Sequence, residues 1–201
     1  MQRLSVHPDN PQERHISLAV NILQNGGIIC YPTDTVYGVG CNIFNKKAIE
    51  KIYQWKGKSY TAPLSFICPN LKDISKYAHV STPNYKIMKR LLPGPFTFIL
   101  PASSLVPKIM LKKRKTVGIR VPLNRVCQML LEEFKNPIVS TSATDSEQNI
   151  LNDPDEIAEE LNHVLDLFLD CGPLGLEPST VIDLTAEMPL VLREGKGVIE
   201  V

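Results

Sequence analysis

Hydroxyl-bearing side chains gather directly after an apolar run in the first quarter of the chain. In "IICYPTDTVYGVGC", residues 28–41, the apolar letters break at Pro32 and a Thr-Asp-Thr tripeptide follows. Where strands of an open α/β sheet end, backbone N–H groups and short polar side chains become available to ligands. Two roles stay open for Thr33: its hydroxyl faces a cleft, or it satisfies the local backbone in a Ser/Thr turn.

Two arginines lie within apolar strand-like segments. Arg120 belongs to "VGIRVP" and Arg193 to "LVLREGKG". Burying a guanidinium among apolar residues is costly unless a carboxylate or a phosphate pairs with it. Each arginine therefore either binds an anionic ligand or pairs with a structural carboxylate, for which Asp183 is a candidate.

Two lysines flank a glycine in "QWKGKSY". The letters Gly57-Lys58-Ser59 resemble the end of a P-loop, but the first glycine of that motif would fall on Ile52, inside a helical pattern, so the motif fails. Lys56 and Lys58 either act as mobile point charges for phosphate or lie at a solvated helix end, where the helix dipole favours cations.

Composition limits the class of protein. A chain of 201 residues with 43% hydrophobic content predicts one domain over residues 1–201, and a net charge of +1 argues against a strongly basic nucleic-acid-binding protein. Five scattered cysteines without a C-x-x-C pair suggest reduced thiols and no metal site. No segment has the roughly 18 apolar residues of a membrane span, so we expect a cytoplasmic protein.

Helical and strand-like patterns alternate along the chain, which predicts an α/β protein. The expected fold is a single open, twisted and mostly mixed β-sheet flanked by helices. The predicted helices cover residues 10–26, with Asn10 as N-cap and Gly26 at the end, 46–56, 84–92, 125–134 and 153–162, with Asp153 as N-cap. About eight strands are predicted, at residues 27–31, 63–68, 96–100, 116–121, 137–140, 165–170, 179–184 and 189–194.

Taken together, five ordered motifs resemble the YrdC-like domain family, which occurs in threonylcarbamoyl-adenylate synthases and in YciO proteins. The motifs are "GGIICYPTDTVYGVG", "LLPGPFTFIL", "VGIRVP", "STSAT" and "PSTVIDL…VLREG". The opening "HPDNPQERHISLAVNILQNGGIICYPTD" together with "KRKTVGIRVP" is most similar to the YciO branch. The resemblance covers nearly the whole chain.

The resemblance implies condensation of L-threonine, bicarbonate or CO2, and ATP into threonylcarbamoyl-AMP and pyrophosphate. This product serves the modification of adenosine 37 in tRNAs and would pass to a threonylcarbamoyl-transfer machinery. By position, the residues implied for threonine are Thr33, Arg120, Ser140, Ser179 and Thr180. Those implied for ATP, with Mg²⁺ carried by the nucleotide, are Lys56, Lys58, Thr116, Ser142, Thr144 and Arg193. Lys56, Lys58 and Arg120 would be catalytic.

Three positions depart from the synthase pattern. A K-x-R element is Lys56-Gly57-Lys58 here, an S-x-N element is Ser142-Ala143-Thr144, and an expected histidine is Ile67. These changes remove oriented hydrogen bonds and favour a slower enzyme or one whose reaction is lost.

The alternative function is binding of double-stranded RNA, tRNA or a nucleotide, with the synthase activity weak or lost. Its candidate residues form the basic run Lys112, Lys113, Arg114 and Lys115 in "LKKRKTVGIR". Such a run gives salt-sensitive phosphate contacts, or it is simply a solvated loop.

Overall fold

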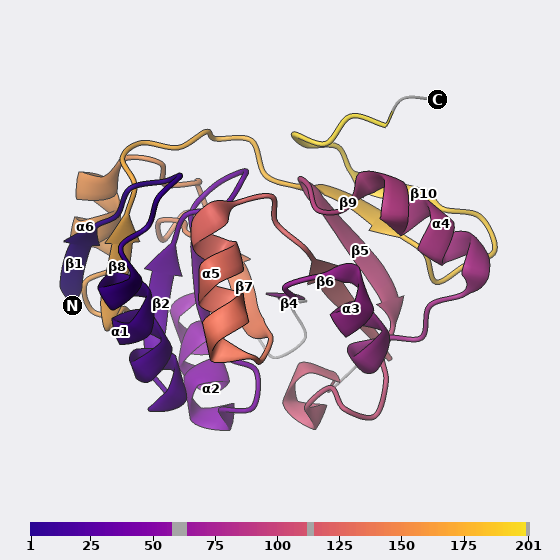
Figure 1. Cartoon of the computed structure of the whole chain (residues 1–201), viewed down its shortest axis with the longest axis horizontal. Coiled ribbons are helices and arrows are strands. Elements are labelled where there is room, and N and C mark those ends of the chain that lie inside the picture. The colour runs from indigo at the N-terminus through magenta and orange to yellow at the C-terminus, as the bar shows by residue number, and fades with distance from the viewer. Residues whose placement is uncertain (58–63, 112–114, 200–201) are drawn as a thin grey trace.

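The computed structural model describes residues 1–57, 64–111 and 115–199. Its described strands form one open mixed sheet in the order β1-β8-β2-β3-β7-β4-β6-β5-β9-β10. The predicted fold class is confirmed. Figure 1 shows the chain beginning at one end of this sheet and ending near the other.

The helices are α1 Glu13–Gln24, α2 Lys46–Trp55, α3 Leu71–Tyr77, α4 Thr82–Leu91, α5 Arg125–Phe134 and α6 Pro154–Glu160, with a 3-10 turn at Lys108–Leu111. The strands are β1 Gln2–Ser5, β2 Ile28–Tyr31, β3 Gly38–Asn42, β4 Ser65–Ile67, β5 Phe96–Pro101, β6 Thr116–Arg120, β7 Ile138–Ser142, β8 Leu167–Asp170, β9 Thr180–Asp183 and β10 Leu190–Arg193. Pairing is parallel in β1/β8, β2/β8, β4/β6 and β5/β9, and antiparallel in β2/β3, β3/β7, β4/β7, β5/β6 and β9/β10.

Helices cover both faces of the sheet because the strand side chains alternate. In β2, Ile29 and Tyr31 pack in one core cluster with the apolar faces of α1 and α5. Ile28 and Cys30 point the other way and pack in the cluster that holds α2. Figure 1 shows α1 and α5 side by side on the near face.

Two strands and one helix escaped sequence prediction. β1 carries polar residues and is held by its parallel pairing with β8. β3 is glycine-rich, which is atypical of a strand. A side chain at Gly40 would put its Cβ 2.3 Å from the Val139 carbonyl oxygen, so only glycine lets β3 approach β7. The missed helix, α3, has only seven residues.

The predicted N-cap of the first helix is wrong by two residues. Helix α1 begins at Glu13 with Gln12 in the N-cap position. The backbone N–H of Asn10 instead donates to His7 Nδ1 at 3.1 Å, so residues 7–12 form a turn of their own. The other two predicted ends are confirmed: Gly26 has φ +82°, and Asp153 caps α6 by accepting from the Asp155 N–H.

Among the described residues, no helix is both long and apolar enough to cross a membrane.

Candidate active site

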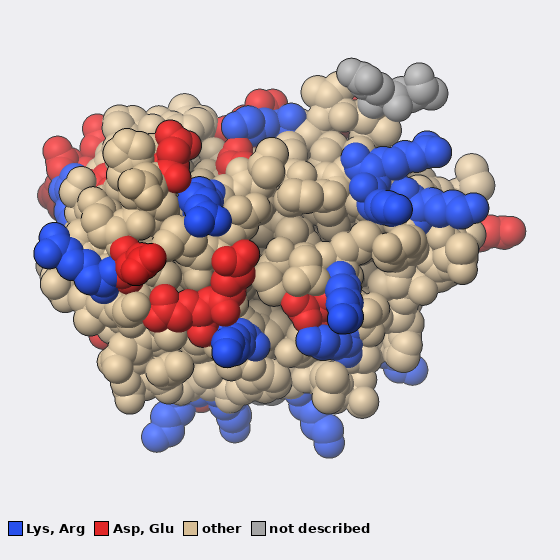
Figure 2. Space-filling model, in the orientation of Figure 1, with Lys and Arg blue, Asp and Glu red and all other residues tan. Residues whose placement is uncertain are grey.

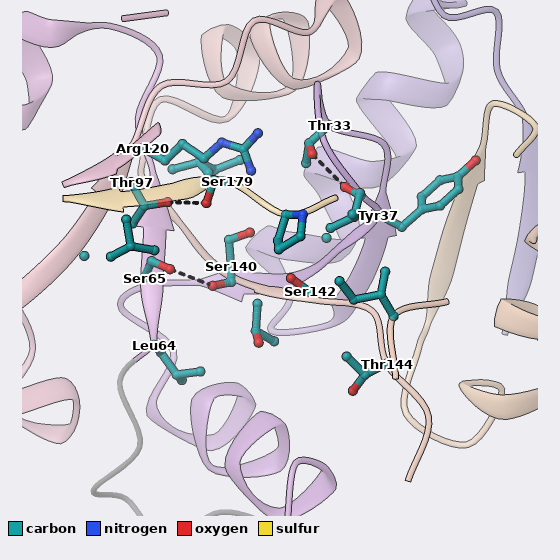
Figure 3. Close-up of a pocket in the computed structure, with 18 of the residues that line it drawn as sticks. Thr33, Tyr37, Leu64, Ser65, Thr97, Arg120, Ser140, Ser142, Thr144 and Ser179 are labelled. Carbon is teal, nitrogen blue, oxygen red and sulfur yellow. Dashed lines mark hydrogen bonds between the residues drawn. The ribbon is translucent and has the colours of Figure 1, made fainter. Parts of the chain in front are cut away.

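A cavity of about 420 Å³ lies on the face of the sheet, between the loops that follow β2 and β7 and the strands β5, β9 and β10 (Figure 3). Hydroxyl side chains dominate its polar lining. The described lining residues with a hydroxyl on Ser or Thr are Thr33, Ser65, Thr97, Ser140, Thr141, Ser142, Thr144 and Ser179. The cationic ones are Lys56, Arg120 and Arg193.

Four neighbouring strands supply the floor of the cavity with alternate residues. The lining pairs are Ser65 and Ile67, Thr97 and Ile99, Gly118 and Arg120, and Ser140 and Ser142. Residues two apart in a strand point to the same face, so register alone brings these side chains together. Ser65 lies opposite both Gly118 and Ser140, and Ile67 lies opposite Arg120.

Gly118 has no side chain, which leaves space in the middle of this floor. A Cβ at this position would lie 3.1 Å from Ser65 Cβ and 3.4 Å from side-chain atoms of Thr97 and Ile99. A larger residue would fill the cavity or push these side chains out of place.

Arg120 is buried and forms an ion pair with Asp34, the residue between the two threonines of the loop after β2. The contact joins one terminal guanidinium nitrogen to one carboxylate oxygen. Arg120 Nε and Asp34 Oδ2 are both buried and have no hydrogen-bond partner among the described residues. The expectation that Asp183 would pair with an arginine is wrong, since its carboxylate accepts from the Thr185 N–H.

Lys56 follows α2 directly and is 6% exposed. The alternative that Lys56 is a solvated side chain at a helix end is therefore wrong. Its ammonium donates to the Ser142 carbonyl at 2.8 Å and to Thr144 Oγ1 at 2.7 Å. It also lies 4.4 Å from the centre of the Trp55 ring, a cation–π contact. The charge is therefore held at the cavity wall by acceptors from the segment that ends β7.

Thr33 fills both roles left open by its sequence. Its hydroxyl donates to the Val36 carbonyl at 2.6 Å and accepts from the Thr35 N–H at 3.1 Å, which is a Ser/Thr turn. The same side chain is buried and lines the cavity. The turn thus fixes the orientation of the loop that presents Asp34 to Arg120.

Ser179 connects the far wall to the last strand. Its hydroxyl shares a 2.8 Å hydrogen bond with Thr97, and its carbonyl accepts from Arg193 Nη2 at 2.7 Å and Nε at 3.1 Å. Partial burial, and then the nearby charge of Arg120, lower the pKa of the Arg193 guanidinium below its ordinary value. Arg193 and Arg120 are therefore close enough in the cavity for the charge of one to affect the other.

The charges in the cavity are unbalanced. The described residues that line it include three cations and no Asp, Glu or His. Asp34 balances the charge of Arg120 through their ion pair, but Asp34 itself is not one of the residues that line the cavity. Such a cavity suits a ligand with more than one negative charge, and its hydroxyls can donate to phosphate or carboxylate oxygens.

No cysteine is among the described residues that line the cavity. Burial raises the pKa of the Cys30, Cys41, Cys68 and Cys127 thiols well above their ordinary value. Among the described residues, no group of three or more His, Cys, Asp or Glu is placed to hold a metal ion. What the cavity offers is positioning and positive charge.

Most of the predicted site residues come together. Those that line the cavity are Thr33, Lys56, Arg120, Ser140, Ser142, Thr144, Ser179 and Arg193. Thr116 and Thr180 are not among the lining residues, and the Thr180 hydroxyl is used within the fold, donating to the Gly197 carbonyl and accepting from the Gly195 N–H.

Four predicted residues, Lys58, Lys112, Lys113 and Arg114, lie outside the described residues. Lys115 is exposed and does not line the cavity.

Sequence reasoning missed Asp34 as a partner of Arg120, and Ser65 and Thr97 as lining residues. Thr97 gave a signal, since it is a polar residue at an alternate position of the apolar run "FTFIL". The sequence around Asp34 indicates only a turn and gives no sign of its pairing with Arg120, because 86 residues separate the two.

The family model that matches this chain is Sua5/YciO/YrdC, described as "Telomere recombination", and it matches residues 21–195. An uncharacterized protein of Haemophilus influenzae is 43% identical over 195 residues, which cover 96% of this chain and 94% of that protein. The uncharacterized protein YciO of Escherichia coli is 42% identical over 194 residues, again 96% of this chain and 94% of that protein. Its crystal structure matches with a TM-score of 0.94 and covers 98% of this chain and 97% of that chain.

A synthase is a more distant relative. The threonylcarbamoyl-AMP synthase of Pyrococcus abyssi is 31% identical over 187 residues, which cover 92% of this chain and 55% of that protein. The crystal structure of P. abyssi Sua5 complexed with L-threonine matches with a TM-score of 0.90 at 29% identity, covering 97% of this chain and 58% of that chain. The chain therefore belongs to the Sua5/YciO/YrdC family and is more similar to YciO than to these synthases.

Proposed function

We propose that this protein condenses L-threonine, bicarbonate or CO2, and ATP into threonylcarbamoyl-AMP, with release of pyrophosphate. One observation carries the proposal: three cations and eight Ser or Thr hydroxyls line one cavity whose described lining residues include no carboxylate. Two of the proposed substrates carry carboxylate or phosphate groups, which such a lining can bind. The relationship to a threonylcarbamoyl-AMP synthase supports the same reaction.

The amino acid would bind around Arg120. Asp34 occupies one terminal nitrogen of the guanidinium, and the remaining N–H groups would donate to the substrate carboxylate. Ser140 is well placed to donate, because its oxygen already accepts from the Tyr31 hydroxyl at 2.7 Å and its own proton is left for a ligand. Thr33 and Ser179 would complete this part of the site.

The nucleotide would bind along the wall formed by Lys56 and Arg193. Lys56 is held by Ser142 and Thr144, so its charge is fixed before the triphosphate arrives. Mg²⁺ would enter with the nucleotide. The apolar lining residues Leu64, Val36 and Ile150 leave a place for the base.

The reaction needs no protein nucleophile. The neutral threonine amine first adds to CO2, which forms from bicarbonate with loss of water, and the amine proton passes to solvent as the carbamate forms. A carbamate oxygen then attacks the α-phosphorus while the bond to pyrophosphate breaks. Negative charge moves onto the leaving pyrophosphate. Fixed cations and hydroxyls that stabilise this charge, together with alignment of the three substrates, supply the catalysis.

Two of the positions that depart from the synthase pattern, Thr144 and Ile67, line the cavity. Thr144 gives Lys56 a hydroxyl acceptor in place of an amide, and Ile67 presents an apolar side chain to the cavity beside Arg120. Each substitution removes one possible hydrogen bond to substrate. We therefore expect turnover slower than in a synthase with the full pattern.

The test is release of pyrophosphate from ATP by the purified chain, with threonine and bicarbonate omitted in turn. We expect release that needs all three substrates and falls about 10²-fold in Lys56→Ala. Lys89→Ala, an exposed lysine on α4, is the matched control and should behave as the unmodified chain. Release that does not depend on threonine, or that is as fast in Lys56→Ala as in the unmodified chain, would refute the proposal.

A second candidate is RNA binding without this reaction, and a surface feature favours it. Figure 2 shows basic side chains grouped over α4, whose exposed cations are Lys86, Lys89 and Arg90 and which contains no acidic residue. If pyrophosphate release is absent and duplex RNA binds in a salt-sensitive way, this function replaces the first.

A further inference from the structure

The segment after β7 turns back on itself as a short hairpin over residues 144–150. Thr144 and Ile150 pair as an isolated antiparallel bridge, and the Asp145 N–H donates to the Asn149 carbonyl at 3.0 Å. The Asp145 carboxylate accepts from the backbone N–H of Asn149 at 2.8 Å and from its side-chain amide at 2.9 Å. These contacts close the base of the hairpin and fix the conformation of its tip, residues 146–148.

Gln148 ends this tip in a left-handed backbone conformation, with φ +73°. A three-residue hairpin loop commonly places glycine at such a position, because a side chain there is strained. Among the described residues, the other non-glycine residue with positive φ is Lys135, which follows the end of α5, where left-handed residues are common. Such strain clusters at active sites and ligand-binding sites, where the strained residue has a use.

Gln148 lines the cavity together with Thr144 and Ile150 of the same hairpin. Its backbone N–H donates to the Asp145 carbonyl at 3.2 Å, but its side-chain amide has no hydrogen-bond partner among the described residues. The residue is exposed, so this amide stays accessible where the cavity opens. The described part of the fold makes no use of the amide, which is left for a ligand.

We propose that the Gln148 amide binds the base of the nucleotide. This inference rests on the proposed function, which puts the phosphates of ATP beside Lys56. Phosphate oxygens only accept hydrogen bonds and are matched by cations, whereas the edge of an adenine base both donates and accepts. A glutamine amide also does both, and it can pair with adenine through two hydrogen bonds at once.

The hairpin carries both ends of this arrangement. Thr144, at its start, accepts from the Lys56 ammonium at 2.7 Å and so belongs to the phosphate end. Ile150, at its other end, is an apolar residue of the cavity lining, as is Leu64. An apolar wall suits the faces of a base, and a polar group beside that wall fixes the orientation of the base. Gln148, two residues before Ile150, supplies this polar group.

Isothermal titration of the whole chain with ATP, and separately with tripolyphosphate, tests this in the variant Gln148→Gly. We expect about tenfold weaker binding of ATP, because hydrogen bonds to the base are lost. Binding of tripolyphosphate, which has no base, should be unchanged. Glycine also adopts φ +73° without strain, so the urea midpoint of unfolding should rise.

Ser146→Gly is the matched control, because Ser146 lies in the same tip, is exposed and does not line the cavity. It should leave both affinities unchanged and should not raise the urea midpoint. Lys56→Ala is a second control and should weaken the binding of both ATP and tripolyphosphate, because its charge would face the phosphates.

The inference is wrong if the unmodified chain does not bind ATP, or if Gln148→Gly binds ATP as tightly as the unmodified chain. It is also wrong if Gln148→Gly weakens tripolyphosphate as much as ATP, since the amide would then contact phosphates. A urea midpoint that falls in Gln148→Gly, or an ATP affinity that falls equally in Ser146→Gly, would assign the residue to the fold.

The same titrations separate this inference from the proposed reaction. ATP binding that depends on Gln148, without release of pyrophosphate, would support the inference and refute the reaction. Threonine-dependent release, with an ATP affinity that Gln148→Gly leaves unchanged, would support the reaction and overturn the inference.

Discussion

The cavity and the surface of α4 both carry several cations, but they hold them in different ways. In the cavity, Lys56 and Arg120 are buried and engaged by protein acceptors, with Asp34 on one and Thr144 on the other. On α4, Lys86 and Lys89 are exposed side chains. A buried charge that is already oriented can act on a bound ligand without reorganisation, whereas an exposed lysine is screened by water and salt.

This comparison shows that the density of basic residues along the sequence does not reveal where the cavity lies. The densest basic runs of the sequence are "YKIMKRLL", residues 85–92, and "LKKRK", residues 111–115, yet the cavity takes its three cations from separate segments. Five predictions test the difference, in order of decreasing expected effect.

Arg120→Ala should have the largest effect. It removes the proposed carboxylate ligand and leaves Asp34 buried without a partner, so we expect about 10³-fold lower threonine-dependent turnover and a loss of about 3–5 kcal/mol in the free energy of unfolding. Pyrophosphate release and urea denaturation measure the two effects. Arg90→Ala on α4 is the control and should change stability by less than about 0.5 kcal/mol.

The double variant Asp34→Ala/Arg120→Ala separates the two roles of the pair. Removing both charges should restore part of the stability, because no uncompensated charge remains, while turnover stays as low as in Arg120→Ala. Recovered turnover would show that Arg120 serves the fold and not the substrate.

Lys56→Ala should be second in size. We expect turnover about 10²-fold lower and weaker ATP binding, since a cation fixed beside the phosphates is lost. The Ser142 carbonyl and the Thr144 hydroxyl each lose a donor, which should cost about 1–3 kcal/mol of stability. Isothermal titration with ATP checks this against Lys89→Ala, and equal affinities in the two variants would contradict the assignment.

Thr144→Val should have a smaller effect. It keeps the shape of the side chain and removes the hydroxyl that accepts from Lys56 at 2.7 Å. A lost hydrogen bond to a charged group predicts about a tenfold rise in the KM for ATP. Thr116→Val is the informative control, since Thr116 does not line the cavity and its loss should leave the KM unchanged.

Neutralising the α4 surface should have the smallest effect. In the triple variant Lys86→Gln/Lys89→Gln/Arg90→Gln, turnover should stay within about twofold, and stability within about 0.5 kcal/mol per site, because no cavity residue changes. A large fall in turnover would show that this surface contributes to substrate binding, and a fall in RNA binding alone would favour the second candidate function.

The sequence determined the fold class, most helices and strands, and eight of the residues that line the cavity. The strands gave clear signals because alternation and apolar runs are local patterns, and the site residues followed from polar letters in apolar strands and from ordered family motifs. Strand β3 was missed because its glycines give no strand signal, although they are what lets it pair closely with β7.

Tertiary structure decided which charges meet. Sequence could not pair Arg120 with Asp34 instead of Asp183, nor place Lys56 against Ser142 and Thr144, because these contacts join segments about 86–88 residues apart. It also could not tell a buried lysine after α2 from an exposed lysine on α4. Burial and pairing depend on the register and order of the strands, and only the folded sheet fixes both.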